Sequence, residues 1–163
     1  MHYLGPQDFE EVFNLVYKYY SKIELAPDYF AEKTGLEKLR GVTEGVKMDQ
    51  FYPDIYSKAA YLLIQINKGH FFSNGNKRLA LIFVLAFILI NKRKIRKRSK
   101  KQHESKLRAL FPKFQIFQDY QNFLPEEFGY YNLSIIVADS EKYMDSFENL
   151  KIKVKEFFKF SVA

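Results

Sequence analysis

The sequence contains no cysteine among its 163 residues. Without thiols the chain can form neither a disulfide framework nor a thiolate zinc site, a composition compatible with a reducing cytosol. Met1 is followed by His2 and Tyr3 rather than by a charged start and an apolar stretch, so no secretory signal is predicted. We therefore expect a cytoplasmic protein.

Long hydrophobic runs are also scarce. The unbroken apolar run at residues 79–90 has 12 residues, well short of the roughly 20 that a membrane-spanning helix needs. It predicts a buried central helix in a soluble protein with no membrane contact. No internal repeat, proline-rich linker or glycine-serine tract divides the chain, and its length suffices for one core. We expect a single domain over residues 1–163.

The net charge of +7 is concentrated in one segment. Residues 92–101 hold eight cations and no acid, and the rest of the chain is nearly neutral. A solvated helix end or mobile loop is the plainer interpretation of this run. The alternatives are contact with nucleic acid, with the ribosome or with an acidic partner. The cations are Lys92, Arg93, Lys94, Arg96, Lys97, Arg98, Lys100 and Lys101.

Helical periodicity dominates the sequence. Apolar residues recur at spacings of three and four in three stripes, a long helix is expected from residue 76, and shorter ones near 107–111 and 133–137. We expect an all-α fold, a compact helical bundle around a buried central helix, with a short flap or hairpin near residues 42–52. The stripes are Phe9, Val12, Phe13, Val16 and Tyr20; Tyr56, Ala59, Ala60, Leu63 and Ile66; and Met144, Phe147, Leu150, Val154, Phe157 and Phe158.

Polar residues are concentrated immediately before the apolar run. A helix that begins near Asn76 has free N–H groups and partial positive charge at its start. Asn74 is suited to cap it, and Gly75 allows a ligand to approach the backbone. Lys77 and Arg78 in the first turn oppose the dipole, at a cost of about 0.3–1 kcal/mol each. A bound phosphate would remove this conflict.

His70 precedes this helix start and can act as a general base near neutral pH. Phe72 is the expected anchor of the loop, and Lys68 adds a further candidate phosphate contact. Together these residues favour phosphoryl-type transfer. The same residues also suit an ordinary helix entry with a structural histidine and solvated cations.

Residues 70–78 read HFFSNGNKR, which resembles the signature of the Fic/Doc family, H-x-F-x-(D/E)-G-N-(G/K)-R, and most closely its death-on-curing (Doc) branch. The resemblance covers a core region of about residues 35–91 and leaves a C-terminal helical extension, 104–163, unaligned. It implies the Fic fold and transfer of part of a nucleotide, ATP or another nucleoside triphosphate, onto a protein hydroxyl.

The resemblance also implies roles for single residues. His70 would deprotonate a Ser, Thr or Tyr of the target, and residues 42–52 would hold the target peptide. Asn74 occupies the place of the usual Mg²⁺ ligand, where an amide brings no negative charge and weakens metal binding. The phosphates would be bound by Gly75, Asn76, Lys77 and Arg78.

Two positions distinguish the branches of the family. AMP-transferring members usually have glycine at the place of Lys77 and an arginine at the place of Leu81. This chain therefore resembles Doc, a kinase that phosphorylates elongation factor Tu. The alternatives are AMP transfer (AMPylation) or a catalytically impaired binding module. No self-inhibitory motif is visible in the sequence, so a Phd-type antitoxin is the expected restraint of a toxin of this kind.

Overall fold

Helix α4 (Asn76–Ile90) lies at the centre of the molecule. It packs against α1 (Phe9–Tyr20), α3 (Ile55–Lys68) and α6 (Pro125–Ala138). Burying each large apolar side chain contributes about 1.5–3 kcal/mol, and a helix that is apolar all round is stable in an interior. The predicted buried central helix is confirmed. Its buried apolar residues are Leu79, Ala80, Leu81, Phe83, Val84, Phe87 and Ile88.

The computed structural model describes residues 1–20, 26–120, 123–143 and 146–163. Within these ranges every regular element is helical and no strand is present, which confirms the all-α class. Met144 of the predicted C-terminal stripe lies outside the described residues. No described helix combines the length and the apolar character needed to cross a bilayer. The other elements are α2 (Lys33–Gly45), α5 (Lys100–Leu110), α7 (Phe147–Ser161) and the short 3-10 helices η1 (Pro6–Asp8), η2 (Tyr29–Ala31) and η3 (Ser140–Lys142).

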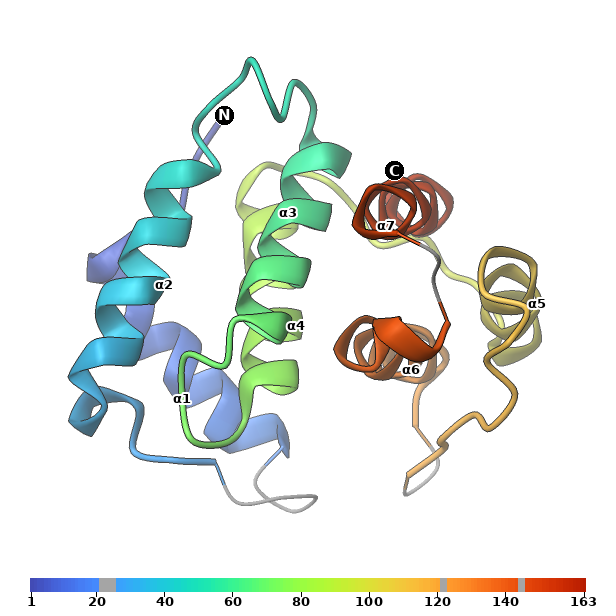
Figure 1. Cartoon of the computed structure of the whole chain (residues 1–163), viewed down its shortest axis with the longest axis horizontal. Coiled ribbons are helices and arrows are strands. Elements are labelled where there is room, and N and C mark those ends of the chain that lie inside the picture. The colour runs from blue at the N-terminus through green and yellow to red at the C-terminus, as the bar shows by residue number, and fades with distance from the viewer. Residues whose placement is uncertain (21–25, 121–122, 144–145) are drawn as a thin grey trace.

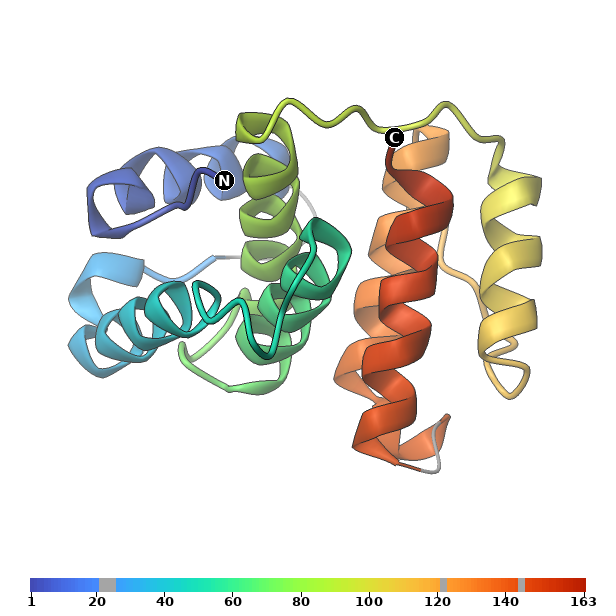
Figure 2. The same ribbon diagram turned by 90° about the horizontal axis from the view of Figure 1, so that it is seen from above.

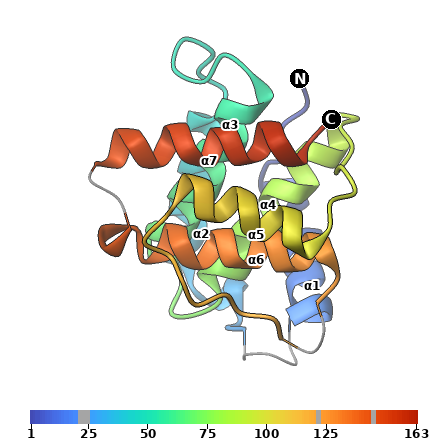
Figure 3. The same cartoon turned by 90° about the vertical axis from the view of Figure 1, so that its right-hand side faces the viewer.

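The helices form two adjoining groups, with α1–α4 on the left of Figure 1 and α5–α7 on the right. Helix α7 packs on α3, α6 packs on both α3 and α4, and α5 covers α6 and α7 (Figure 3). Helices α3 and α4 flank the loop of residues 69–75. The C-terminal third therefore supports the two helices between which the sequence motif lies.

Helix α2 was not predicted from the sequence. It contains Gly35, Gly41 and Gly45 and many polar residues, which weaken a helical signal. Gly35 is buried, and a Cβ atom there would meet the Phe71 carbonyl and the Phe72 ring. The glycine thus allows α2 to lie directly against the motif loop.

The flap predicted near residues 42–52 has a different structure and position. Helix α2 extends to Gly45, and turns without strand pairing follow it. This loop enters the N-terminus of α3, whereas His70 follows the C-terminus of the same helix. Since 14 residues of helix rise about 21 Å, the segment lies at the far end of α3 from the motif (Figure 1). The hairpin prediction is wrong.

The basic run connects α4 to α5 as an extended strap (Figure 2). Its backbone pairs with the C-terminal residues: Arg96 N–H donates to the Ser161 carbonyl at 2.8 Å, and Ala163 N–H to the Lys94 carbonyl at 2.8 Å. Ser99 Oγ then accepts from Gln102 N–H and caps α5. The run is therefore tied to the C-terminal end of α7 rather than being a free loop.

Candidate active site

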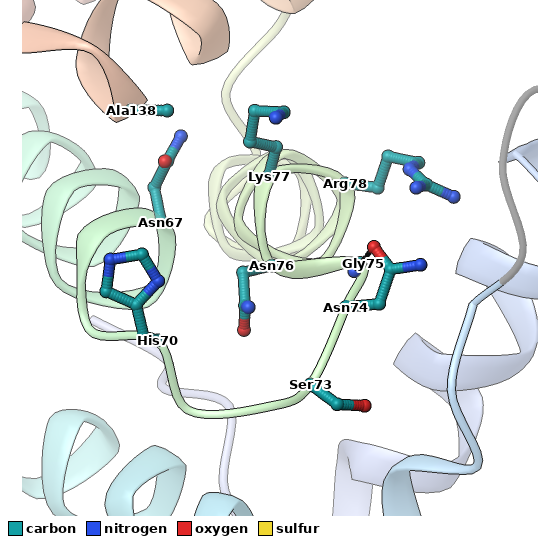
Figure 4. A pocket seen from close by; sticks show the side chains of 9 residues that line it. All are labelled: Asn67, His70, Ser73, Asn74, Gly75, Asn76, Lys77, Arg78 and Ala138. Carbon is teal, nitrogen blue, oxygen red and sulfur yellow. Dashed lines mark hydrogen bonds between the residues drawn. The ribbon is translucent and has the colours of Figure 1, made fainter.

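The motif loop begins where α3 ends. Gly69 N–H donates to the Gln65 carbonyl at 3.0 Å and closes the last turn. His70 then has φ +49°, in the left-handed region that few residues other than glycine adopt. This turn leaves the imidazole exposed, beside the start of α4 (Figure 4).

Phe72 anchors the middle of the loop. Its ring is buried edge-on against Tyr29, with centroids 4.9 Å apart, and against Phe13 at 6.1 Å. Its backbone is held on both sides by Asn76: Phe72 N–H donates to Asn76 Oδ1 at 3.1 Å, and Asn76 Nδ2 donates to the Phe72 carbonyl at 2.8 Å. The Asn76 amide therefore fixes the loop, a role that its position in the motif did not reveal.

Gly75 forms the turn into α4. It has φ +70°, and its carbonyl accepts hydrogen bonds from the Tyr29 hydroxyl at 3.0 Å and from Leu79 N–H at 3.0 Å. A Cβ atom at this position would meet Tyr29 Oη and Pro27 Cδ. Both the left-handed conformation and the close approach of Tyr29 require glycine here.

Ser73 is held by Glu32, the residue that immediately precedes α2. Its N–H and its hydroxyl donate to the two carboxylate oxygens of Glu32, at 2.7 and 2.8 Å. Because Tyr29 and Glu32 both form hydrogen bonds with the motif loop, residues 27–32 lie alongside it. Neither residue was singled out in the sequence, because both lie about 40 residues upstream and contact the loop only through tertiary packing.

These elements enclose a cavity of about 160 Å³. It brings six of the predicted site residues together, and Figure 4 shows His70 and Arg78 on opposite sides of the start of α4, with Lys77 between them. Among the described residues no carboxylate lines it, and no hydrogen bond or ion pair engages the Lys77 ammonium. With the α4 dipole added, the cavity is suited to an anion. The lining residues are Asn67, His70, Ser73, Asn74, Gly75, Asn76, Lys77, Arg78 and Ala138.

Lys68 does not join this group. Its ammonium donates to Ser140 Oγ at 2.7 Å and to Glu141 Oε1 at 2.8 Å, on the side of η3. The hydrogen bond from Lys68 holds the pKa of Glu141 below its usual value. The structure thus uses Lys68 to join α3 to the C-terminal helices, and the residue is absent from the cavity lining.

Asn67 is a cavity residue that the sequence analysis missed. Its side chain is 4 % exposed, and Nδ2 donates to the Ser134 carbonyl of α6 at 3.0 Å. That bond orients the amide, and Oδ1 is left buried without a partner among the described residues. One feature of the sequence could have identified it: Asn67 is a polar residue next to the apolar stripe of α3, three positions before His70.

The residues present offer little to a metal ion by themselves. The described residues contain no cluster of three His, Cys, Asp or Glu side chains that could hold one. Asn74 Oδ1 accepts from Gly75 N–H at 2.7 Å. Because Mg²⁺ depends on carboxylates and substrate phosphates, it would fit here when bound mainly by the phosphates of a nucleotide, with Asn74 as the residue that would hold it.

Comparison with known proteins gives one match. No curated protein and no solved structure matches the chain. One family model does match, that of the Fic/DOC family, whose members are typically transferases. The match covers residues 10–88, just under half of the chain. This range includes α2, α3 and the whole motif loop.

Proposed function

We propose that this chain is a Fic-type transferase that moves a phosphate-containing group from a nucleoside triphosphate to a hydroxyl of a target protein. The observation that carries the proposal is the shared cavity: an exposed histidine, the N-terminus of α4 and two cations, Lys77 and Arg78, line one space. The volume of about 160 Å³ suits phosphate groups rather than a whole nucleotide, whose nucleoside would extend outside.

In this mechanism His70 removes the proton from the target Ser, Thr or Tyr hydroxyl. The hydroxyl oxygen attacks the γ-phosphorus of ATP, the bond to the bridging oxygen breaks, and ADP leaves with that electron pair. Lys77, Arg78 and the first N–H groups of α4 stabilise the charge on the phosphate oxygens. A Mg²⁺ ion, when bound, would neutralise further phosphate charge.

Phosphate transfer is the favoured reaction over AMP transfer. Leu81, at the place of the second arginine of AMP-transferring members, is 2 % exposed and packed in the core, so α4 offers no third cation one turn after Lys77. An elongation factor Tu-like protein is the proposed target in the cytoplasm, and a Phd-type antitoxin the proposed restraint.

The test is a pair of labelling reactions. Purified protein, Mg²⁺ and a bacterial lysate receive ATP labelled on the γ- or the α-phosphate. Label from γ alone supports phosphate transfer, and the labelled band identifies the target. Label from the α-phosphate would indicate AMP transfer instead of phosphate transfer. Transfer of neither label would contradict the proposed activity.

A second candidate function is that of a catalytically impaired binding module. It rests on Asn74, which brings no charge to the metal position, in a cavity whose described lining has no carboxylate. If wild-type protein transfers neither label, the variant Asn74→Asp separates the two candidates. Rescued transfer would indicate a site that lacks only its metal ligand, and continued silence would favour the binding module.

A further inference from the structure

The strap between α4 and α5 carries exposed charge that the molecule does not neutralise. Among the described residues, the one ion pair of the run joins Lys100 to Asp119, 3.0 Å apart. Arg98 packs over the Phe160 ring, 4.6 Å from its centroid. The remaining cations are exposed and have no acidic partner in the described part of the chain: Lys92, Arg93, Lys94, Arg96, Lys97 and Lys101.

Backbone pairing holds the middle of the strap in an extended conformation. Pairing with residues 161–163 keeps residues 94–96 extended, and Ile95 packs against the core while its neighbours Lys94 and Arg96 are exposed. An extended chain advances about 3.3 Å per residue and alternate side chains share a face, so Lys94 and Arg96 stand about 7 Å apart on one side. This spacing is close to that of every second phosphate in a nucleic-acid strand, which carries one phosphate per about 3.4 Å.

A groove continues from the end of the strap. It has a volume of about 450 Å³ and is lined by α5 residues, with Phe160 of α7 on its other side. Two cations lie near the half-buried Phe160 ring: Arg98, and the Lys106 ammonium at 5.7 Å from the ring centroid. Lys101, Gln102 and Ser105 supply charge and hydrogen-bonding groups along the same groove.

We infer that the strap and this groove form a binding surface for single-stranded nucleic acid, which the proposed transferase activity does not require. The cations of the strap would contact successive phosphates, and an unpaired base would stack on the surface made by Phe160 and Arg98. An acidic protein would explain the charge but not the aromatic residue in the groove.

This surface is separate from the cavity. The strap follows the C-terminus of α4 and the cavity lies at its N-terminus, so the 15 residues of that helix separate them by about 22 Å. A strand bound on the strap would leave His70 accessible. The two functions can therefore be measured independently.

The test measures binding of a fluorescein-labelled 20-nucleotide oligouridine RNA by anisotropy, at salt concentrations from 50 to 200 mM. The strap variant replaces Lys94, Arg96, Lys97 and Lys101 with Gln. A matched control removes the same charge from exposed lysines elsewhere, with Gln at Lys33, Lys38, Lys113 and Lys142. Circular dichroism checks that both variants fold.

The inference predicts that the strap variant binds at least 10-fold more weakly at 100 mM salt, while the control stays within about 2-fold of the wild type. The slope of log affinity against log salt should fall by about 3, since each phosphate contact of a single strand contributes about 0.7. Phe160→Leu should weaken binding by about 5- to 100-fold without changing the slope, through lost stacking.

Three results would overturn it. Equal losses in the strap and control variants would mean attraction by net charge alone. Displacement of the RNA by polyglutamate at equal charge concentration would mean that the surface fits an acidic protein. Unchanged affinity of Phe160→Leu would remove the groove from the site.

Discussion

Gly75 is the residue on which the geometry of the motif depends most directly. Its left-handed backbone turns the chain into α4, and its carbonyl takes the Tyr29 hydroxyl. The sequence indicated that a glycine here would let a ligand approach the backbone. The need to accommodate Tyr29 was not visible, because that contact spans 46 residues.

Replacing Gly75 with alanine should destabilise the protein by about 1–3 kcal/mol, from the left-handed conformation and the contact of the new Cβ with Tyr29. Gly41→Ala is the matched control, since no atom lies within 4 Å of its added Cβ and it lies within α2. That change should stabilise the protein by about 0.5–1 kcal/mol. Urea unfolding measures both, and equal stabilities of the two variants would contradict this account of Gly75.

Substitutions of Lys77 and Lys68 test which of the two lysines binds phosphate. Lys77→Met should weaken binding of ATP by about 10- to 100-fold, because a charged hydrogen bond contributes about 1.5–3 kcal/mol. Lys68→Met should leave ATP affinity within about 2-fold, since its ammonium is engaged by Ser140 and Glu141. Isothermal titration calorimetry gives both values. A comparable loss in Lys68→Met would restore Lys68 as a phosphate ligand.

At the scale of elements, the sequence indicated every helix with a clear apolar stripe. The predicted stripes correspond to α1, α3 and α7, the apolar run to α4, and the two shorter patterns to α5 and α6. Helix α2 was missed because its buried residues include Gly35 and Thr43, which give no hydrophobic signal. The flap prediction failed because α2 was not recognised, and the first residues of the predicted flap belong to that helix.

The loop of residues 46–54 is held by a buried lysine of α3. Lys58 Nζ donates to the Val46 carbonyl at 2.8 Å and to Asp49 Oδ1 at 2.7 Å, and it lies over the Tyr3 ring. A buried carbonyl that loses its partner costs about 1–3 kcal/mol. The loop should therefore be ordered mainly by this one side chain.

Lys58→Met should destabilise the protein by about that amount and accelerate chymotrypsin cleavage near the exposed Phe51. The control is Lys47→Met, which removes an exposed pair with Glu44 and should change stability by less than about 1 kcal/mol. Limited proteolysis with mass spectrometry locates the cut. Cleavage as slow as in the wild type would show that the loop is held by other contacts.

At the scale of the whole molecule, the two helix groups meet through α6 and α7. The sequence could not predict this packing, because each apolar stripe fixes which face is buried but not its partner. One consequence is His103 of α5, which lies fully buried among the rings of Tyr130, Phe157 and Phe160. Neither ring nitrogen has a hydrogen-bond partner among the described residues.

Burial lowers the pKa of His103 below its ordinary value of 6.5; Glu126 opposes this change and Arg98 adds to it. The unfolded chain therefore takes up a proton at higher pH than the folded chain does. The contribution of neutral His103 to stability is complete above pH 6.5 and falls as the pH decreases below that value.

Wild-type protein should thus lose more stability between pH 8 and pH 5.5 than the variant His103→Leu, whose side chain does not titrate. Urea unfolding at both pH values gives, for each protein, the change in the free energy of unfolding between pH 8 and pH 5.5. A difference in absolute stability between the two proteins at pH 8 does not affect this comparison. Equal pH-dependent losses in both proteins would contradict the lowered pKa.

The central claim is that His70 acts as a base beside a phosphate site, and the most direct measurement compares the wild type with His70→Ala. Both receive γ-labelled ATP, Mg²⁺ and purified, unlabelled target protein, the one that labelling of the lysate identifies. The account predicts ATP affinity within about 2-fold of the wild type and transfer slower by about 10²- to 10⁴-fold. Undiminished transfer by His70→Ala would contradict it.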